Sequence, residues 1–215
     1  MSGVLVIGGD APEVGDLARS LGGEVEALPP APGGASGAAA AGEALDAWRG
    51  AAVGGAKAAR VVVVPWGSAP GASPLAALDL DAWTDRSELA LARWVAALGV
   101  AKARCADDGA IVALVDRPAP LDAAGWAPEC GVADAVEALT RSLARSEGPR
   151  GVRVNAVTTP ARLTHVPVVD PAPPLGAFPG SVLLEAAGAV RLLLEPDAMG
   201  LTGTVLHADC GRSWR

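Results

Sequence analysis

The carboxylates Asp116 and Glu129 are the side chains whose types and spacing best suit chemistry at a single site. Asp116 directly follows an apolar segment, residues 109–115, and Glu129 lies thirteen residues later, just before a helical segment. Two carboxylates that share a cleft can divide their pKa values, so that one acts as an acid and the other as a base. The alternative is that both side chains are solvated or held in ion pairs and carry no chemistry.

Other kinds of catalytic or metal chemistry have less support in the sequence. The chain contains no tyrosine, so no tyrosine can act as a general acid. The cysteines Cys105, Cys130 and Cys210 are widely spaced without a CxxC pair, and we expect them to be reduced thiols. The two histidines, His165 and His207, are too far apart to suggest a metal site.

A glycine-rich turn follows the first apolar segment of the chain. Residues 3–7 predict a strand, Gly8 and Gly9 a tight turn, and the next residues have apolar side chains at helical spacing. Strand, glycine turn and helix open the βαβ units that bind dinucleotides, in which backbone N–H groups at the helix start receive the pyrophosphate. A purely structural strand-to-helix turn is the alternative.

The remaining chain alternates between predicted strands and helices. Apolar runs predict further strands at about 24–28, 60–65, 109–115, 152–157 and 204–208, and helices are expected at about 43–58, 82–103, 131–147 and 182–194. In the helix from 131, an apolar face is predicted from Val132, Ala135, Val136, Leu139 and Leu143. Residues 29–42 are rich in Pro, Gly and Ala and predict a flexible connection. This pattern predicts an α/β fold with a doubly wound parallel sheet, in one domain covering residues 1–215.

The charge of the chain limits the classes of partner that it is expected to bind. The net charge is −7 and the pI is about 4.8, so we expect neither nucleic acid nor an anionic membrane surface as a partner. No apolar run reaches the roughly 20 residues that span a bilayer. The first residues lack the basic start of a signal peptide, and we therefore expect a cytoplasmic protein.

Two segments closely resemble the short-chain dehydrogenase/reductase (SDR) family, especially its 3-oxoacyl-ACP-reductase-like members. They are AVEALTRSLARSEGPRGVRVNAV, which ends at Val157, and TGTVLHADCGR, which ends at Arg212. The resemblance covers nearly the full length and implies a Rossmann-like SDR fold. The family has a further strand before the valine-rich strand at 60–65. Here that interval holds only residues 29–42 and one helix, so one strand is expected to be missing or shortened after the second strand.

The resemblance also implies where catalytic residues would lie, and all four positions are changed. Glu129 replaces the family's catalytic Tyr, Ala133 the Lys that lowers the pKa of that Tyr, Asp116 the Ser and Ala90 the Asn. The chain thus has the family's scaffold without its catalytic side chains.

The cofactor positions are partly kept. Gly9 and Gly15 match the family's glycine-rich turn, but Glu13 stands where the middle glycine belongs, and Asp10 adds a second negative charge. Gly67 survives from the family's Asn-Asn-Ala-Gly, with Trp66 beside it, and Thr164 matches a threonine near the nicotinamide. These changes lead us to expect no bound cofactor, although NAD(P) binding stays open.

The function implied is that of a catalytically inactive SDR-like subunit, a pseudoenzyme. It would pair with an active SDR oxidoreductase through the helices at about 82–103 and 132–147, in a hetero- or homo-oligomer, as a dimer or tetramer. One alternative is an active NAD(P)-dependent oxidoreductase with a displaced set such as Asp116, Glu129 or His165. Another is an SDR-like protein that senses a ligand or nucleotide without chemistry.

Overall fold

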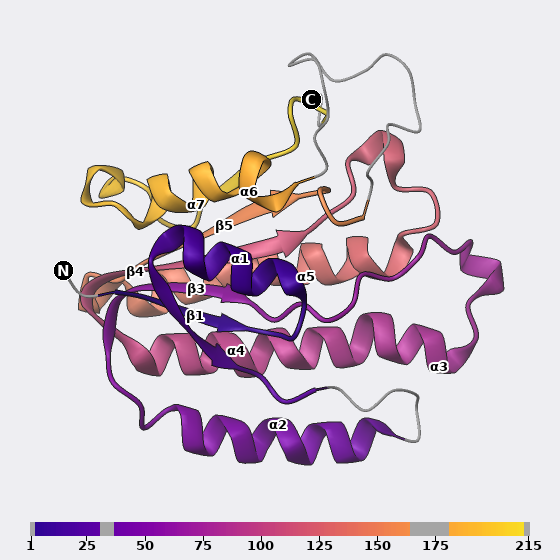
Figure 1. Ribbon diagram of the computed structural model, residues 1–215, viewed down its shortest axis with the longest axis horizontal. Coiled ribbons are helices and arrows are strands. Elements are labelled where there is room, and N and C mark those ends of the chain that lie inside the picture. The colour runs from indigo at the N-terminus through magenta and orange to yellow at the C-terminus, as the bar shows by residue number, and fades with distance from the viewer. Residues whose placement is uncertain (1–2, 31–36, 164–180, 213–215) are drawn as a thin grey trace.

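A parallel sheet in the order β2-β1-β3-β4-β5-β6 forms the centre of the molecule (Figure 1). The computed structural model describes residues 3–30, 37–163 and 181–212. Within these residues the strands are β1 (Val4–Gly8), β2 (Gly23–Ala27), β3 (Ala58–Val64), β4 (Cys105–Asp116), β5 (Arg153–Thr159) and β6 (Val205–His207). Every neighbouring pair is parallel, so the carboxyl ends of the strands meet at one edge. The predicted α/β class with a doubly wound parallel sheet is confirmed.

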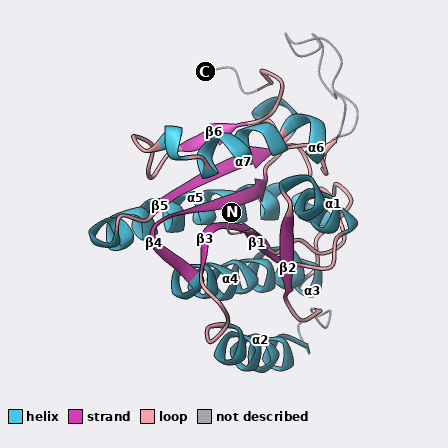
Figure 2. Ribbon diagram, turned by 60° about the vertical axis from the view of Figure 1, so that its left-hand side comes forward, coloured by secondary structure: helices cyan, strands magenta, loops and turns pink. Residues whose placement is uncertain are grey.

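Helices cover both faces of this sheet (Figure 2). One face is packed by α2 (Ala38–Ala52), α4 (Ala90–Arg104) and α5 (Ala127–Glu147). The other is packed by α1 (Pro12–Leu21), α6 (Val182–Glu185) and α7 (Ala187–Leu194). Alternate valines of β3 point to opposite layers: Val61 and Val63 belong to the first and Val62 and Val64 to the second. A strand buried on both faces explains the unbroken valine run.

The edge of the sheet at β2 confirms the predicted loss of a strand. The described residues between β2 and β3 form α2, and β3 pairs with β1 on the side away from β2. The predicted bounds of α2 were wrong, because residues 38–42 are helical and the helix ends at Ala52. The alanine run before Glu43 has high helix propensity, and Gly54 and Gly55 follow the last turn.

The predicted helix at 82–103 is three joined segments. A short helix, α3 (Leu80–Trp83), leads into a π-helical turn, η3 (Thr84–Leu89), and then into α4. Asp79 caps the start, because its side chain accepts a hydrogen bond from the Ala82 N–H at 2.8 Å. π-turns inside helices often occur at functional sites.

The predicted apolar face of α5 was only partly correct. Val136 is fully buried, but Val132, Leu139 and Leu143 are only partly buried. The buried line of α5 runs instead through a set with polar members: Glu129, Ala133, Val136, Thr140, Ala144 and Glu147. Glu129 and Glu147 can lie on the buried line because arginine and lysine partners satisfy them, and the larger apolar side chains are turned toward the surface.

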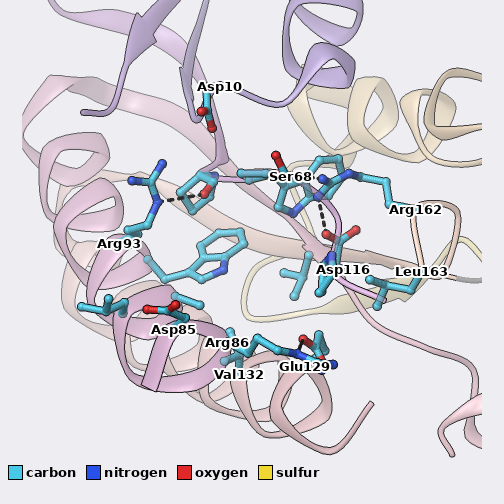
Figure 3. Close-up of a pocket in the computed structure, with 18 of the residues that line it drawn as sticks. Asp10, Ser68, Asp85, Arg86, Arg93, Asp116, Glu129, Val132, Arg162 and Leu163 are labelled. Carbon is cyan, nitrogen blue, oxygen red and sulfur yellow. Dashed lines mark hydrogen bonds and ion pairs between the residues drawn. The ribbon is translucent and has the colours of Figure 1, made fainter. Parts of the chain in front are cut away.

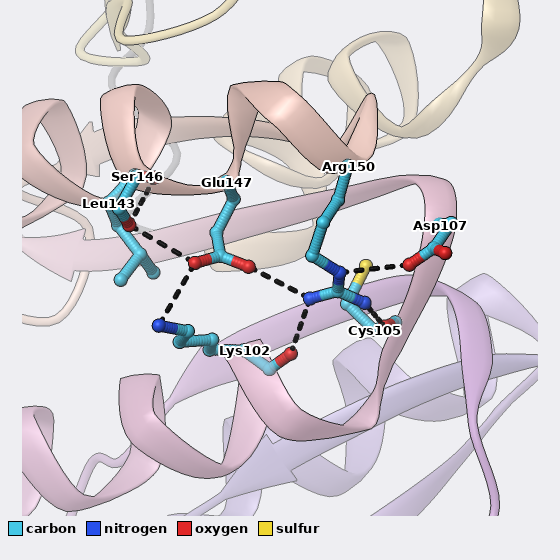
Figure 4. Close-up of polar contacts among 7 residues, drawn as sticks. All are labelled: Lys102, Cys105, Asp107, Leu143, Ser146, Glu147 and Arg150. Carbon is cyan, nitrogen blue, oxygen red and sulfur yellow. Dashed lines mark hydrogen bonds and ion pairs between the residues drawn. The ribbon is translucent and has the colours of Figure 1, made fainter.

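A polar cluster fastens the end of α5 to the start of β4 (Figure 4). The carboxylate of Glu147, which is 2% exposed, accepts hydrogen bonds from Arg150 at 2.8 Å and Ser146 at 3.1 Å, and pairs with Lys102 at 3.1 Å. Arg150 also donates to the carbonyl of Cys105 at 2.7 Å and to Asp107 at 2.8 Å. The cluster lies at the amino end of β4, and its contacts hold the end of α5 against the start of that strand.

Candidate functional site

A cavity of about 440 Å³ lies at the carboxyl ends of β3 and β4 (Figure 3). Its walls come from the loop after β3, from η3 and α4, from the start of α5 and from the loop after β5. Clefts at the carboxyl ends of the strands are the usual ligand sites of open α/β sheets. The lining side chains include Asp10, Trp66, Arg86, Leu89, Arg93, Trp94, Asp116, Glu129, Val132, Arg162 and Leu163.

Glu129, which matches the family's Tyr, is held by Arg86. The guanidinium donates two hydrogen bonds to the carboxylate, from Nε and Nη2, each of 2.7 Å, and both side chains are largely buried. Arg86 also lies 5.8 Å from the ring centroid of Trp126. A bidentate pair of this kind fixes both side chains and occupies both carboxylate oxygens.

Asp116, which matches the family's Ser, is held by Arg162. Nη1 of Arg162 donates to the Asp116 carboxylate at 2.5 Å. Burial raises the pKa of Asp116 to about 7, although Arg162 acts in the opposite direction and Glu13 and Glu129 add to the rise. Near neutral pH the carboxyl group of Asp116 is therefore divided between its protonated and ionised forms.

Arg162 also contacts two other positions at which the SDR resemblance breaks down. Its Nε lies 3.5 Å from the carboxylate of Glu13, which replaces the middle glycine of the turn. Its guanidinium lies over the indole ring of Trp66, 4.5 Å from the centroid, and Nη2 donates to the carbonyl of Gly67 at 2.6 Å. Three substitutions that are far apart in the sequence, Glu13, Trp66 and Asp116, thus meet at one buried arginine.

The glycine-rich turn is closed by backbone contacts. The N–H of Gly9 donates to Val64 at 3.1 Å, the N–H of Ala11 donates to Trp66 at 3.2 Å, and Pro12 has no N–H. A Cβ on Gly9 would lie 1.9 Å from the Trp66 carbonyl oxygen, so the turn is pressed against the loop after β3. The turn thus has two engaged backbone donors and two carboxylates, those of Asp10 and Glu13, where a helix start would otherwise offer free N–H groups.

The other predicted site residues are distributed between the cavity, the core and the turn. Ala90 and Gly67 line the cavity beside Asp116 and Glu129. Ala133 is fully buried in the core beneath α5. Gly15 lies in α1, where a Cβ would make an ordinary 3.6 Å contact with Arg19, so this position does not require glycine for space. Thr164 and His165 lie outside the described residues.

Sequence reasoning missed the three arginines of the cavity, Arg86, Arg93 and Arg162. None of them belongs to a motif, and the carboxylate partners of Arg86 and Arg162, which are Glu129, Asp116 and Glu13, lie 43 to 149 residues away in the chain. The one available signal was indirect, because two carboxylates that share a cleft require compensating charges.

Metal and membrane sites find no support in the part of the chain that the structure describes. It contains no group of three or more His, Cys, Asp or Glu side chains that could hold a metal ion. None of its helices is long and apolar enough to cross a bilayer.

Comparison with known proteins identifies the fold. A short-chain dehydrogenase/reductase from Serratia marcescens is 22% identical, with a TM-score of 0.69 over 99% of this chain and 98% of that one. An SDR glucose/ribitol dehydrogenase from Brucella melitensis is 19% identical, with a TM-score of 0.70 over 99% and 97% of the two chains. A blue fluorescent protein from a metagenomic library, solved in complex with NADPH, is 20% identical with a TM-score of 0.65 over 99% of this chain and 98% of that one.

The chain therefore has the fold of the short-chain dehydrogenase/reductases, as its sequence predicts. No protein-family model matches the sequence. No curated protein matches it either. The likeness is thus one of fold, and the chemistry of the site has to be argued from its own residues.

Proposed function

We propose that this chain is a non-catalytic subunit with the SDR fold, which assembles with an active SDR protein and does not itself reduce a carbonyl with NAD(P)H. The observation that carries the proposal is the convergence of Glu13, Trp66 and Asp116 on Arg162. Residues that interact in this way form a connected structural unit at the positions where the family binds its cofactor and substrate.

The acid–base side chains of the family's reaction are replaced in this chain, and Asp116, whose pKa of about 7 keeps it partly protonated near neutral pH, is held in an ion pair with Arg162. Carbonyl reduction requires a proton donor near the carbonyl oxygen. Glu129 has both oxygens engaged by Arg86, Asp116 is engaged by Arg162, and the position matching the family's Lys is the buried Ala133. Two carboxylates beside a carbonyl that gains negative charge would also raise the energy of the transition state. The ion-paired arrangement of these carboxylates therefore supports the non-catalytic alternative.

The same reasoning applies to the cofactor. NADPH is bound by the metagenomic blue fluorescent protein of similar fold. In this chain a pyrophosphate would meet the carboxylates of Asp10 and Glu13 and the engaged amides of Gly9 and Ala11. We therefore propose that this chain does not bind NAD(P) in that way.

The surface of α4 supports assembly with another subunit. Ala92, Val95 and Ala103 are exposed on this helix, and Val95 retains 47% of its surface. On the neighbouring α5, Leu139 and Leu143 are partly exposed. Small and apolar side chains let helices approach closely, and an apolar surface on two adjacent helices suits a helix-on-helix interface.

Two measurements test the proposal. The tagged full chain, recovered from its native host under gentle conditions, is expected to bring down a stoichiometric SDR protein with an intact Tyr-x-x-x-Lys. The purified chain is expected to consume no NADPH above background with acetoacetyl thioesters. Recovery of the chain alone, or clear NADPH consumption by the purified chain, would reject the proposal.

Surface variants test whether α4 forms the interface with the partner subunit. Val95→Glu places a charge on α4 and is expected to abolish recovery of the partner. Leu184→Glu is the matched control, because Leu184 is 76% exposed on α6, which packs on the opposite face of the sheet. Equal recovery with both variants would remove α4 from the interface.

The competing enzyme hypothesis has its own test. If Asp116 and Glu129 form a displaced acid–base pair, Glu129→Gln should leave assembly intact and abolish a measurable NADPH-dependent turnover. If the carboxylate of Glu129 is only structural, the same substitution should change stability without changing any rate.

A further inference from the structure

Arg93 differs from the other deeply buried arginines of the described chain in its partners. Four arginines are at most 7% exposed: Arg93, Arg104, Arg162 and Arg212. The last three each pair with a carboxylate, those of Glu26, Asp116 and Asp122 respectively. Arg93 has no carboxylate of the described residues within ion-pair distance, although buried charges are almost always paired.

The hydrogen bonds of Arg93 leave part of its guanidinium unused. Nη1 donates to the carbonyl of Pro29 at 2.6 Å, and Nε makes a longer 3.4 Å contact with the carbonyl of Pro65. Neither of these two hydrogen bonds uses Nη2. Burial lowers the pKa of Arg93, and the carboxylate of Asp10 acts in the opposite direction without forming an ion pair. The positive charge of Arg93 is thus removed from water and only partly compensated.

Arg93 forms part of the wall of the 440 Å³ cavity (Figure 3). The other arginines of that wall are neutralised, since Arg86 pairs with Glu129 and Arg162 with Asp116. The rest of the wall combines the apolar side chains of Leu89, Trp94, Val132 and Leu163 with the polar residues Asp10, Ser68 and Asp85. A cavity of this volume whose wall combines apolar side chains with a few polar groups is typical of a small-molecule site.

We propose that this cavity binds a small monocarboxylate with an apolar body, whose carboxylate pairs with Arg93 and whose body packs against Trp94 and Leu89. A carboxylate accepts from a guanidinium in a planar geometry and supplies the charge that Arg93 lacks. A phosphate monoester carries nearly two negative charges. It would be repelled more strongly by Asp10 on the same wall, so a monoanion fits this site better.

The inference rests on the proposed function in one respect, because it takes the cleft to be free of NAD(P). The two can fail separately. NADPH binding to the same protein preparation is measured in parallel by equilibrium dialysis, and saturable NADPH binding together with a retained preference for the carboxylate ligand would count against the proposed function alone.

The test is calorimetric titration of the full chain with 2-naphthoate and with its neutral analogue 2-naphthamide. We expect saturable binding of the naphthoate, about tenfold tighter than that of the amide, since a hydrogen-bonded charge pair contributes about that factor. No saturable heat with naphthoate up to about 1 mM, or equal affinity for the two compounds, would overturn the proposal.

Variants place the carboxylate at Arg93. Arg93→Met should remove the preference for naphthoate over naphthamide. Arg153→Met is the matched control, because Arg153 also donates to backbone carbonyls, those of Leu193, Glu195 and Ala198, and is not part of the cavity wall. Retention of the preference for naphthoate in Arg93→Met would overturn the assignment of the carboxylate to Arg93. If that variant fails to fold, the relative affinities of the parent chain for naphthoate and naphthamide test the proposal.

Discussion

The guanidinium of Arg162 lies over the indole ring of Trp66, with 4.5 Å between its central carbon and the ring centroid. Both residues are 5% exposed, so the contact is shielded from water, where a cation on an aromatic face contributes up to about 2 kcal/mol. Trp66 follows β3 and Arg162 follows β5, and Arg162 reaches Asp116 at the end of β4 as well. One side chain therefore joins the carboxyl ends of three strands.

Replacing that arginine should be costly. Arg162→Met leaves Asp116 buried without its partner, and we expect a loss of about 3 kcal/mol in the free energy of unfolding at pH 8. Urea denaturation followed by circular dichroism measures the change. Arg19→Met is the control, since Arg19 pairs with Asp16 on the surface and should change stability by less than about 1 kcal/mol. Similar losses in the two variants would contradict a structural role for Arg162.

Asp116 should make stability depend on pH in an unusual direction. Its pKa is raised to about 7 in the folded chain from an ordinary value of 3.8, so between these values the folded state binds the extra proton. The contribution of this group is therefore fully present below about pH 4 and is lost as the pH rises through 7, by an amount on the order of 3 kcal/mol.

The variant Asp116→Asn cannot titrate and should lose less stability than the parent chain between pH 5 and pH 8. Urea denaturation at the two pH values gives the comparison. Parallel pH profiles for the parent and the variant would show that Asp116 titrates in its ordinary range.

Glu147 should have the opposite pH dependence. Burial alone would raise its pKa, but hydrogen bonds from Arg150, Lys102 and Ser146 overcome that effect and lower it. Its contribution is therefore present above the ordinary glutamate pKa and is lost as the pH falls through the depressed value. Glu147→Gln should cost about 2 kcal/mol at pH 7 and should weaken the dependence on pH in acid.

The measurement is thermal unfolding at pH 7 and at about pH 3. Glu195→Gln is a suitable control, because Glu195 pairs with Arg60 while its side chain remains 48% exposed. An equal effect of the two substitutions would show that the cluster of Figure 4 contributes no more than a surface pair.

The two glycines that match the SDR turn should respond oppositely to alanine. Gly9→Ala places a Cβ against the Trp66 carbonyl oxygen and should destabilise the chain by about 3 kcal/mol. Gly15→Ala lies inside α1 with room for the methyl group and should stabilise it by about 0.5–1 kcal/mol. Thermal unfolding of both variants provides the check, and a tolerated alanine at position 9 would mean that the turn can move away from Trp66.

The sequence was sufficient to predict the fold because its signals are local. The valine run of β3, the glycines after β1 and the apolar spacing of α1 each depend on neighbouring residues. The site was predicted only in part. The resemblance placed Asp116 and Glu129 at one cleft, but their arginine partners come from other elements and carry no periodic signal. For the same reason the orientation of α5 was misjudged, since Arg86, the partner of Glu129, and Lys102, one of the partners of Glu147, are distant in sequence.

The missing outer strand leaves the backbone of β2 open along one side, which exposes the molecule to edge-to-edge pairing with another chain. Glu24 and Glu26 alternate with Val25 along this strand, and Val25 is 43% exposed. Charged side chains on an open edge oppose the addition of a further strand, because the incoming backbone would have to desolvate them. Among the described residues β2 pairs only with β1, and Glu24 is the charge on this edge that is expected to oppose a further strand, because Glu26 is paired with Arg104.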